Sequence, residues 1–299
     1  MSDFRSGFVA IVGRPNVGKS TLINALVGSK IAITSHHPNT TRTAIRGIVH
    51  RPEFQAVLVD TPGVHKPKTL LGQRLNQVVD QSMDSVDIVI MCIPADETSG
   101  AGDTFIAQEI AKHPKAKKFA VITKTDLIAK EKLAIRLLGI MKIAEGFVWD
   151  EIIPVSAVIH DQIELLEKII GDNLPAGPAF YPEDQKSDQG IEQLICELIR
   201  EAAMRDALQE LPHSIMVTID EMSKRKGQNL TDIHANIFVE RDSQKGIIIG
   251  HKGSRLIDVG KRSRLEIEKL IGHKVFLGLR VKVASEWQRD PKQLGKLGF

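Results

Sequence analysis

Cysteine, aromatic residues and long apolar runs are all scarce in this chain of 299 residues. The two cysteines, Cys92 and Cys196, cannot build a disulfide framework or a cysteine-rich metal site, and we expect a reducing, cytoplasmic environment. No uncharged run of about 18 apolar residues occurs, and the opening residues MSDFRSGF lack the apolar core of a signal peptide. We therefore expect neither a membrane-spanning segment nor a secretory leader.

Charge is unevenly distributed along the chain, although the net charge is only +3. Residues 241–299 contain 14 Lys and Arg against 6 Asp and Glu, so the rest of the chain is mildly acidic. A basic end on an acidic body favours a polyanion as the partner of that end. Charge alone leaves open the alternative of a basic surface that only faces solvent.

Short apolar runs alternate with helix-like segments over residues 7–171, which predicts an α/β fold with a mostly parallel sheet covered on both faces. Ligands of such sheets bind at the carboxyl ends of the strands. Residues 171–190, rich in Gly, Pro and acids, indicate a linker, and a smaller α+β domain follows. The predicted strands are 7–12, 55–60, 86–93, 117–123, 151–157, 214–222, 231–240 and 273–283. Helices are predicted from Lys19 and over 70–80, 103–112, 130–145, 163–170 and 191–206.

A phosphate-binding pattern, G-x-x-x-x-G-K-S, lies directly after the first predicted strand and opens a helix. Its glycines let backbone N–H groups wrap phosphates, and the start of the helix adds a positive dipole. We expect Lys19 to reach the β- and γ-phosphates and the Ser20 hydroxyl to bind Mg²⁺. The pattern consists of Gly13, Arg14, Pro15, Asn16, Val17, Gly18, Lys19 and Ser20, and Thr21 extends the expected nucleotide site.

The tetrapeptide D-T-P-G ends the second predicted strand, at residues 60–63. In this order after the phosphate loop, Asp60 is expected to hold Mg²⁺ through water, and the N–H of Gly63 to sense the γ-phosphate. Thr61, Pro62 and Val64 complete this part of the nucleotide site.

Base selection is assigned to T-K-T-D, which ends the strand predicted over 117–123. A carboxylate here accepts both the N1–H and the 2-amino group of guanine, a donor pair that adenine lacks, so Asp126 is expected to select guanine. The stem of Lys124 would lie across the base, with Thr125 beside it. After the next predicted strand come Ser156 and Ala157, and the N–H of Ala157 would donate to guanine O6.

Thr123 occupies a position that is usually Asn in this motif. Threonine lacks the amide that braces the phosphate loop, and we therefore expect weaker nucleotide binding with the guanine specificity retained.

The segment ITSHHPNTTRTAIRGI separates the phosphate loop from Asp60. A threonine is needed there to complete the Mg²⁺ shell when the γ-phosphate is present, and we assign Thr41, with Thr40 as the second candidate. His36 and His37 are adjacent but have no further ligands near them in sequence, so they are expected to be loop residues and not a metal site.

The ordered set of motifs resembles the Era family of GTPases, in which P-x-T-T-R precedes D-T-P-G and the phosphate loop is close to G-R-P-N-V-G-K-S-T. The resemblance covers nearly the whole chain. It implies a GTPase domain over residues 1–175, a linker over 176–187 and a KH-type RNA-binding domain over 188–299. It further implies a monomer that binds 16S ribosomal RNA near its 3′ end and assists 30S subunit assembly and rRNA processing.

Many GTPases place a Gln directly after D-x-x-G to orient the attacking water, and here that position holds Val64. The hypothesis is slow hydrolysis in which backbone groups and a cation position the water. In similar GTPases the residue at the position of Asn16 helps to bind K⁺, which implies stimulation by K⁺. The alternative is that Val64 is a packing residue and turnover is simply slow. The expected catalytic residues are Lys19, Thr41, Gly63 and Asn16.

Near the basic end of the chain, G-H-K-G follows an apolar run and opens a helix, which resembles the G-x-x-G loop of a KH domain. The motif alone is weak, because Gly295–Gly298 supplies a second match. The predicted order of helix, strand, strand, helix, G-x-x-G, helix and strand resembles that of a bacterial KH domain, and together with the nearby cations it favours RNA as ligand. The expected contacts are Gly250, His251, Lys252, Gly253, Arg255, Lys261 and Arg262, with Arg264 in the same cluster and Ile237, Ile248 and Ile249 as candidates for an aliphatic groove or core.

Two other functions remain open from the sequence. One is a regulatory GTPase bound peripherally to the inner face of the cell membrane through its basic end, although no convincing amphipathic basic helix is present. The other is an RNA chaperone with weak or no GTPase activity. The intact Lys19, Ser20, Asp60 and Asp126 argue against the chaperone.

Overall fold

The structure of the protein is a computed structural model that describes residues 4–34, 45–61, 85–141, 143, 147–205 and 214–285. The chain forms two compact units, and the boundary between them lies between Asp188 and Gln189. Among the described residues no helix combines the length and apolarity needed to cross a bilayer.

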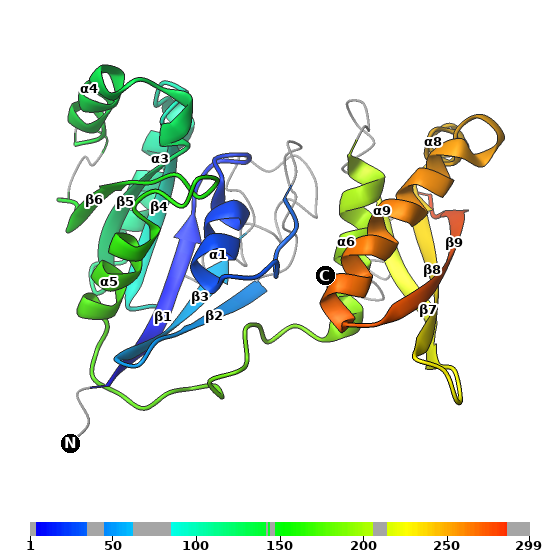
Figure 1. Ribbon diagram of the computed structural model, residues 1–299. Coiled ribbons are helices and arrows are strands. Elements are labelled where there is room, and N and C mark those ends of the chain that lie inside the picture. Colours follow the sequence, from blue (N-terminus) through cyan, green and yellow to red (C-terminus); the bar gives the residue numbers. More distant parts are fainter. Residues whose placement is uncertain are drawn as a thin grey trace. The chain divides into compact units, whose positions relative to one another are not determined.

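A six-stranded sheet forms the centre of the first unit (Figure 1). Its strands are β1 (Arg5–Val12), β2 (Ile45–His50), β3 (Phe54–Asp60), β4 (Ile88–Pro94), β5 (Lys117–Thr123) and β6 (Glu151–Pro154). The spatial order is β2-β3-β1-β4-β5-β6, with only the β2–β3 pair antiparallel. Strands β3 and β2 lie on one side of β1, whereas β4, β5 and β6 lie on the other, so the direction in which the chain adds strands reverses at β1. In sheets of this kind, ligands bind in the crevice at that point.

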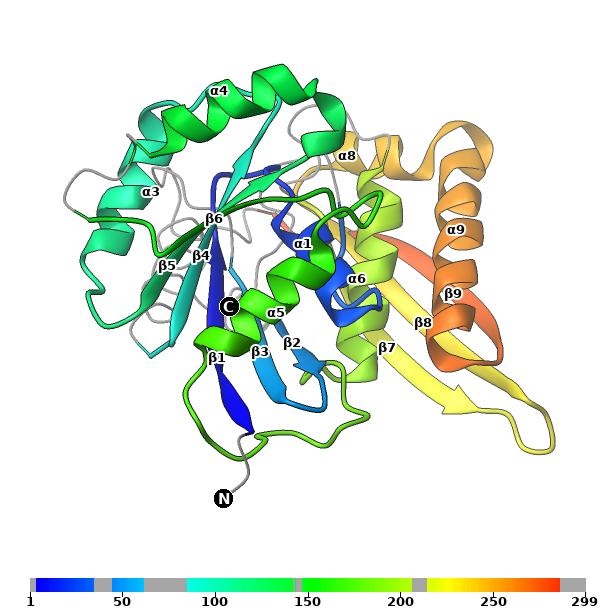
Figure 2. The same ribbon diagram turned by 60° about the vertical axis from the view of Figure 1, so that its left-hand side comes forward.

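Four described helices cover the two faces of this sheet (Figure 2). Strand β1 shows why, because its alternate side chains enter two separate cores. Val9 and Ile11 pack with the buried side chains of α1 and α5, whereas Ala10 and Val12 pack with those of α3 and α4. The helices are α1 (Lys19–Val27), α3 (Ala101–Ala111), α4 (Lys130–Ile140) and α5 (Ile163–Asn173).

The predicted elements of this unit are largely confirmed, and β5 has the predicted bounds. The helix predicted over 130–145 ends earlier, at Ile140, and the one predicted over 70–80 lies outside the described residues. Strand β2 was missed because Arg46, Gly47 and His50 interrupt its apolar pattern. It is the edge strand of the sheet, and only its pairing with β3 makes it a strand.

Residues 176–188, here called the strap, run along the first unit and are anchored by Gln55. This side chain is fully buried in β3. Its Oε1 accepts the backbone N–H groups of Phe180 and Tyr181 at 2.7 and 3.0 Å, and its Nε2 donates to the carbonyl of Tyr181 at 2.8 Å. Most of the strap was predicted as linker, and a single amide side chain satisfies three of its backbone groups.

The end of the strap pairs with the edge strand β2. The N–H of Ile48 donates to the carbonyl of Lys186 at 2.9 Å, and the N–H of Asp188 donates to the carbonyl of Arg46 at 3.4 Å. Gly47 and Ser187 thereby form an antiparallel bridge. The strap extends the sheet by a short segment immediately before the second unit begins.

The second unit is a three-stranded sheet with helices packed on one face (Figures 1 and 2). In chain order its elements are α6 (Ile191–Met204), β7 (Met216–Lys224), β8 (Leu230–Val239), α8 (Asp242–Ile249), a 3₁₀ turn (His251–Gly253), α9 (Ser254–Ile271) and β9 (Lys274–Val283). β7 and β8 are antiparallel, whereas β8 and β9 are parallel. The predicted order of helices and strands is confirmed.

The core of this unit decides the role of several candidate residues. Ile237 and Ile248 are fully buried in it, and Ile249 packs against it. The apolar stripe of α9 is also core, with Val259 and Ile267 buried. Of the candidate groove residues, Ile237 and Ile248 therefore pack in the interior.

Candidate functional site

The phosphate-loop pattern forms a tight turn between β1 and α1. Gly13, Asn16 and Gly18 have φ values of 155°, 64° and 97°, which favour glycine and to a smaller degree asparagine. A Cβ atom on Gly13 would lie 2.8 Å from the carbonyl oxygen of Cys92 in β4, so no larger residue fits. A turn of this kind ahead of a helix N-terminus is suited to an anion.

Lys19, the first residue of α1, is held beneath this turn. Its Nζ donates to the carbonyls of Gly13 and Arg14 at 3.0 and 2.9 Å, which uses two of the three N–H donors of the ammonium. Burial lowers the pKa of Lys19, and the nearby charge of Asp60 opposes this shift. Both the burial and the unused donor favour an anionic phosphate oxygen as the remaining partner of Lys19.

Oxygen donors for a divalent cation meet beside the turn. The Ser20 hydroxyl donates to Oδ2 of Asp60 at 3.0 Å, so the ends of α1 and β3 bring the two predicted ligands together. Hydroxyl and carboxylate oxygens are the ligands that Mg²⁺ prefers, so this pair fits the ion. The hydroxyl of Thr61 donates to the carbonyl of Ile11 at 2.7 Å and fixes the end of β3 to β1. Thr41 and the residues Pro62, Gly63 and Val64 lie outside the described residues.

The predicted base-binding residues meet at the carboxyl ends of β5 and β6. The Ser156 hydroxyl donates to Oδ1 of Asp126 at 2.6 Å and orients this carboxylate. Lys124 has a φ of 59°, and its Nζ lies 3.8 Å from Asp96. Thr125 is tied to the end of β6 through the carbonyl of Val155, 3.4 Å from its N–H. Ala157, next to Ser156, is half-buried.

Thr123 provides the brace that we expected to be missing. Its side-chain hydroxyl donates to the carbonyl of Val17 in the phosphate loop at 2.5 Å, and the residue is buried. Hence the premise that threonine cannot brace this loop is wrong. The contact needs one hydrogen-bond donor, and the threonine hydroxyl supplies it. The structure removes the reason to expect weaker binding.

The G-x-x-G sequence of the second unit forms a turn between α8 and α9. Gly250 has a φ of 72°, and a Cβ atom there would lie 2.7 Å from Cβ of Arg255. His251 and Lys252 are exposed at the tip, and Lys252 has a φ of 48°. The turn therefore presents two polar side chains to solvent ahead of a helix N-terminus.

Comparison with known proteins agrees with both halves of this description. Residues 8–124 match the family described as 50S ribosome-binding GTPase, and residues 210–288 match the KH domain. GTPase Era of Mycobacterium sp. strain JLS is 54% identical over 301 aligned positions, which cover 100% of both chains. This chain belongs to the GTPase Era family.

Two solved Era structures share the fold. Era from Aquifex aeolicus, as a variant bound to GDP and AlF4⁻, is 36% identical with a TM-score of 0.93, and 99% of each chain is covered. Era in complex with MgGDPNP and nucleotides 1506–1542 of 16S ribosomal RNA is 37% identical with a TM-score of 0.94, again over 99% of each chain. Membership makes the present chain a GTP-binding GTPase with a KH domain, which excludes the alternative of an RNA chaperone without GTPase activity.

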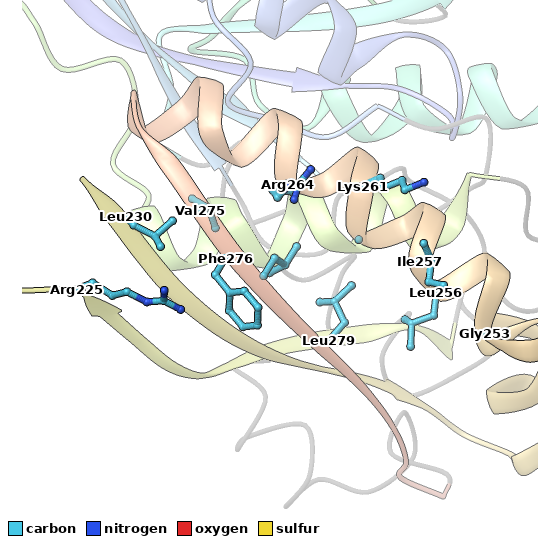
Figure 3. A pocket seen from close by; sticks show the side chains of 12 residues that line it. Arg225, Leu230, Gly253, Leu256, Ile257, Lys261, Arg264, Val275, Phe276 and Leu279 are labelled. Carbon is cyan, nitrogen blue, oxygen red and sulfur yellow. The ribbon is translucent and has the colours of Figure 1, made fainter. Parts of the chain in front are cut away.

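Besides its nucleotide site, this Era-family chain has a groove between α9 and β9 (Figure 3). It has a volume of about 620 Å³. Apolar side chains form its walls, and three cations, Arg225, Lys261 and Arg264, stand along it. The apolar lining comes from Leu230, Leu256, Ile257, Val275, Phe276, Leu277 and Leu279, and Gly253 and Gly260 complete it. The groove begins at the G-x-x-G turn.

The groove differs from the predicted set in several members. Gly253 and Lys261 line it, whereas Arg262 pairs with Asp258 at 2.9 Å and Arg255 packs against Gly250; neither lines the groove. Phe276 and Arg225 were missed. No local sequence signal marks them, because they reach the groove only through the packing of β9 beside α9 and the β7–β8 hairpin.

Replacing Thr123 by Val in this Era-family chain is expected to raise the Kd for GDP about tenfold, because the buried Val17 carbonyl then loses its donor. Thr123→Asn, which restores a donor, should stay within about threefold of the wild type. Titration with a fluorescent GDP analogue measures both. Equal affinity of Thr123→Val and the wild type would show that the brace has no role in binding.

Proposed function

We propose that this chain is a GTP-driven switch that binds 16S ribosomal RNA near its 3′ end and assists 30S subunit assembly and rRNA processing. The groove between α9 and β9 is the observation that carries the RNA role. It combines cations for the phosphates with an apolar wall against which unstacked bases can lie, the combination that single-stranded RNA requires.

The nucleotide site supports the switch part of the proposal. Mg²⁺ bound by Ser20 and Asp60, with Thr41 added in the GTP state, would neutralise charge on the β- and γ-phosphates. Lys19 binds the phosphates, while Asp126 reads the base in the orientation fixed by Ser156. The N–H of Gly63 is the proposed sensor of the γ-phosphate.

Hydrolysis is proposed to be slow and stimulated by K⁺. Asn16 is exposed at the tip of the phosphate loop and has a φ of 64°, and its side chain is the proposed contact of a cation near the phosphates. A monovalent ion there would place positive charge where an arginine finger acts in other GTPases. Val64 has no side-chain donor or acceptor to orient the water.

The strap is the proposed route from the nucleotide to the second unit. It pairs with β2, the strand that follows the expected switch residue Thr41, and it ends directly before Gln189. A change at β2 on GTP binding would alter the pairing of Lys186 and Asp188 and thus the position of the chain that enters the KH domain. RNA affinity would then depend on the nucleotide by population shift.

The experiment is RNA binding by the full chain, measured with nucleotides 1506–1542 of 16S rRNA and a scrambled RNA of equal length. We expect the specific RNA to bind about tenfold more tightly with a non-hydrolysable GTP analogue than with GDP, a typical coupling between two sites. The scrambled RNA should bind more weakly and show the same salt dependence. Equal affinity for both RNAs would contradict the rRNA role.

Cytoplasmic residence and a monomeric state are part of the proposal, and the free thiols of Cys92 and Cys196 support the cytoplasmic residence. Burial raises the pKa of each thiol to about 12, so neither is poised for oxidation or for disulfide exchange.

A further inference from the structure

Arg14, in the phosphate loop, is bound by two carboxylates, Glu97 from the segment between β4 and α3 and Asp103 from the first turn of α3. Its Nε donates to Oδ1 of Asp103 at 2.8 Å, and its Nη2 donates to Oε2 of Glu97 at 3.0 Å. The side chain of Asp103 is fully buried, and that of Arg14 is 27% exposed. An ion pair with one fully buried partner is less screened than an exposed pair and holds its geometry more firmly.

The carboxylate of Asp103, which accepts from Arg14, is itself held by a backbone hydrogen bond. The Oδ2 atom of Asp103 accepts the N–H of Gly100 at 2.9 Å, at the start of α3. The neighbouring Gly102 makes room for the arginine stem, because a Cβ atom there would lie 2.9 Å from Cδ of Arg14. Burial alone would lower the pKa of Arg14, but the hydrogen bonds and charges of Asp103 and Glu97 raise it overall. The guanidinium is therefore held in one place.

The backbone of the same residue supports the catalytic lysine. The carbonyl of Arg14 accepts Nζ of Lys19 at 2.9 Å, and the carbonyl of Gly13 accepts it at 3.0 Å. We propose that Arg14 is a positioning residue: its side chain, fixed by Asp103 and Glu97, holds the two carbonyls that aim Lys19 at the β-phosphate. The proposal rests on the GTPase activity of the family and is independent of the RNA role.

The test compares GDP with GMP, which lacks the β-phosphate. In Arg14→Ala the Kd for GDP should rise about tenfold, while the Kd for GMP stays within about twofold, because the base site is untouched. The measurement is calorimetric titration of the full chain with each nucleotide. A loss of GDP and GMP affinity by the same factor, or no loss of either, would overturn the proposal.

The matched control is Glu109→Gln. It removes an ion pair with Lys112 on the same helix, α3, and should change neither affinity. Arg14→Lys keeps the charge but cannot reach both acids, and we expect its Kd for GDP to lie between those of the wild type and Arg14→Ala. If Arg14→Ala does not fold, the titrations of Arg14→Lys test the proposal instead. A ratio of GMP to GDP affinity equal to that of the wild type would then overturn it.

Discussion

Asp126→Asn is expected to lower the affinity for GDP about a thousandfold, equivalent to about 4 kcal/mol, and to create a preference for xanthosine diphosphate. In the proposed site the carboxylate would accept two N–H groups of guanine, whereas an amide can accept only one and opposes the other with its own NH₂. Xanthine carries a carbonyl where guanine has the 2-amino group, and this oxygen pairs with the new NH₂. A site built for one donor pattern discriminates strongly against another.

The structure supports the test because Asp126 is already oriented. The Ser156 hydroxyl that donates to its Oδ1 can also accept from an amide, so the asparagine side chain can keep this contact. The wild type, Asp126→Asn and a control variant are each titrated with GDP, xanthosine diphosphate (XDP) and ADP. The control, Asp172→Asn, makes the same chemical change on the exposed side of α5 and should bind like the wild type. Unchanged preference for GDP in Asp126→Asn would mean that another group reads the base.

The double substitution His251→Asp and Lys252→Asp is expected to weaken RNA binding about a hundredfold and to leave GTP hydrolysis without RNA unchanged. The two carboxylates would replace exposed polar side chains at the tip of the G-x-x-G turn, where the proposed RNA site places the phosphates. Each like-charge contact at about 4 Å costs about 1 kcal/mol or more, depending on the local dielectric. Asp tolerates the positive φ that Lys252 adopts, so the turn should persist.

Filter binding or fluorescence anisotropy with the 16S fragment measures this effect. The control, Lys130→Asp with Ala134→Asp, alters the net charge equally on the exposed surface of α4. It should lower RNA affinity by about threefold at most, through long-range charge alone. Equal losses in the two double variants would indicate that only net charge, and not the turn, governs RNA binding.

Much of the nucleotide site could be predicted from local sequence. The phosphate loop and Asp126 follow buried strands and Asp60 ends one, and the carboxyl ends of parallel strands meet at one edge of a sheet. The structure places Ser20 beside Asp60 and Ser156 beside Asp126 as this rule requires. The KH order of elements was equally readable, because helix and strand periods differ.

What the sequence alone determined is thus most of the described helices and strands, the class of nucleotide and the position of the G-x-x-G turn, since each depends on residues close together in the chain. Only the tertiary structure decided the rest. Four contacts join residues far apart in sequence: the hydrogen bond from Thr123 to Val17, the ion pair of Arg14 with Asp103, the pairing of the strap with β2, and the lining of the groove by Phe276. Such contacts leave no local pattern, because a single hydrogen bond or side-chain contact depends on how whole elements pack and not on the composition of either segment.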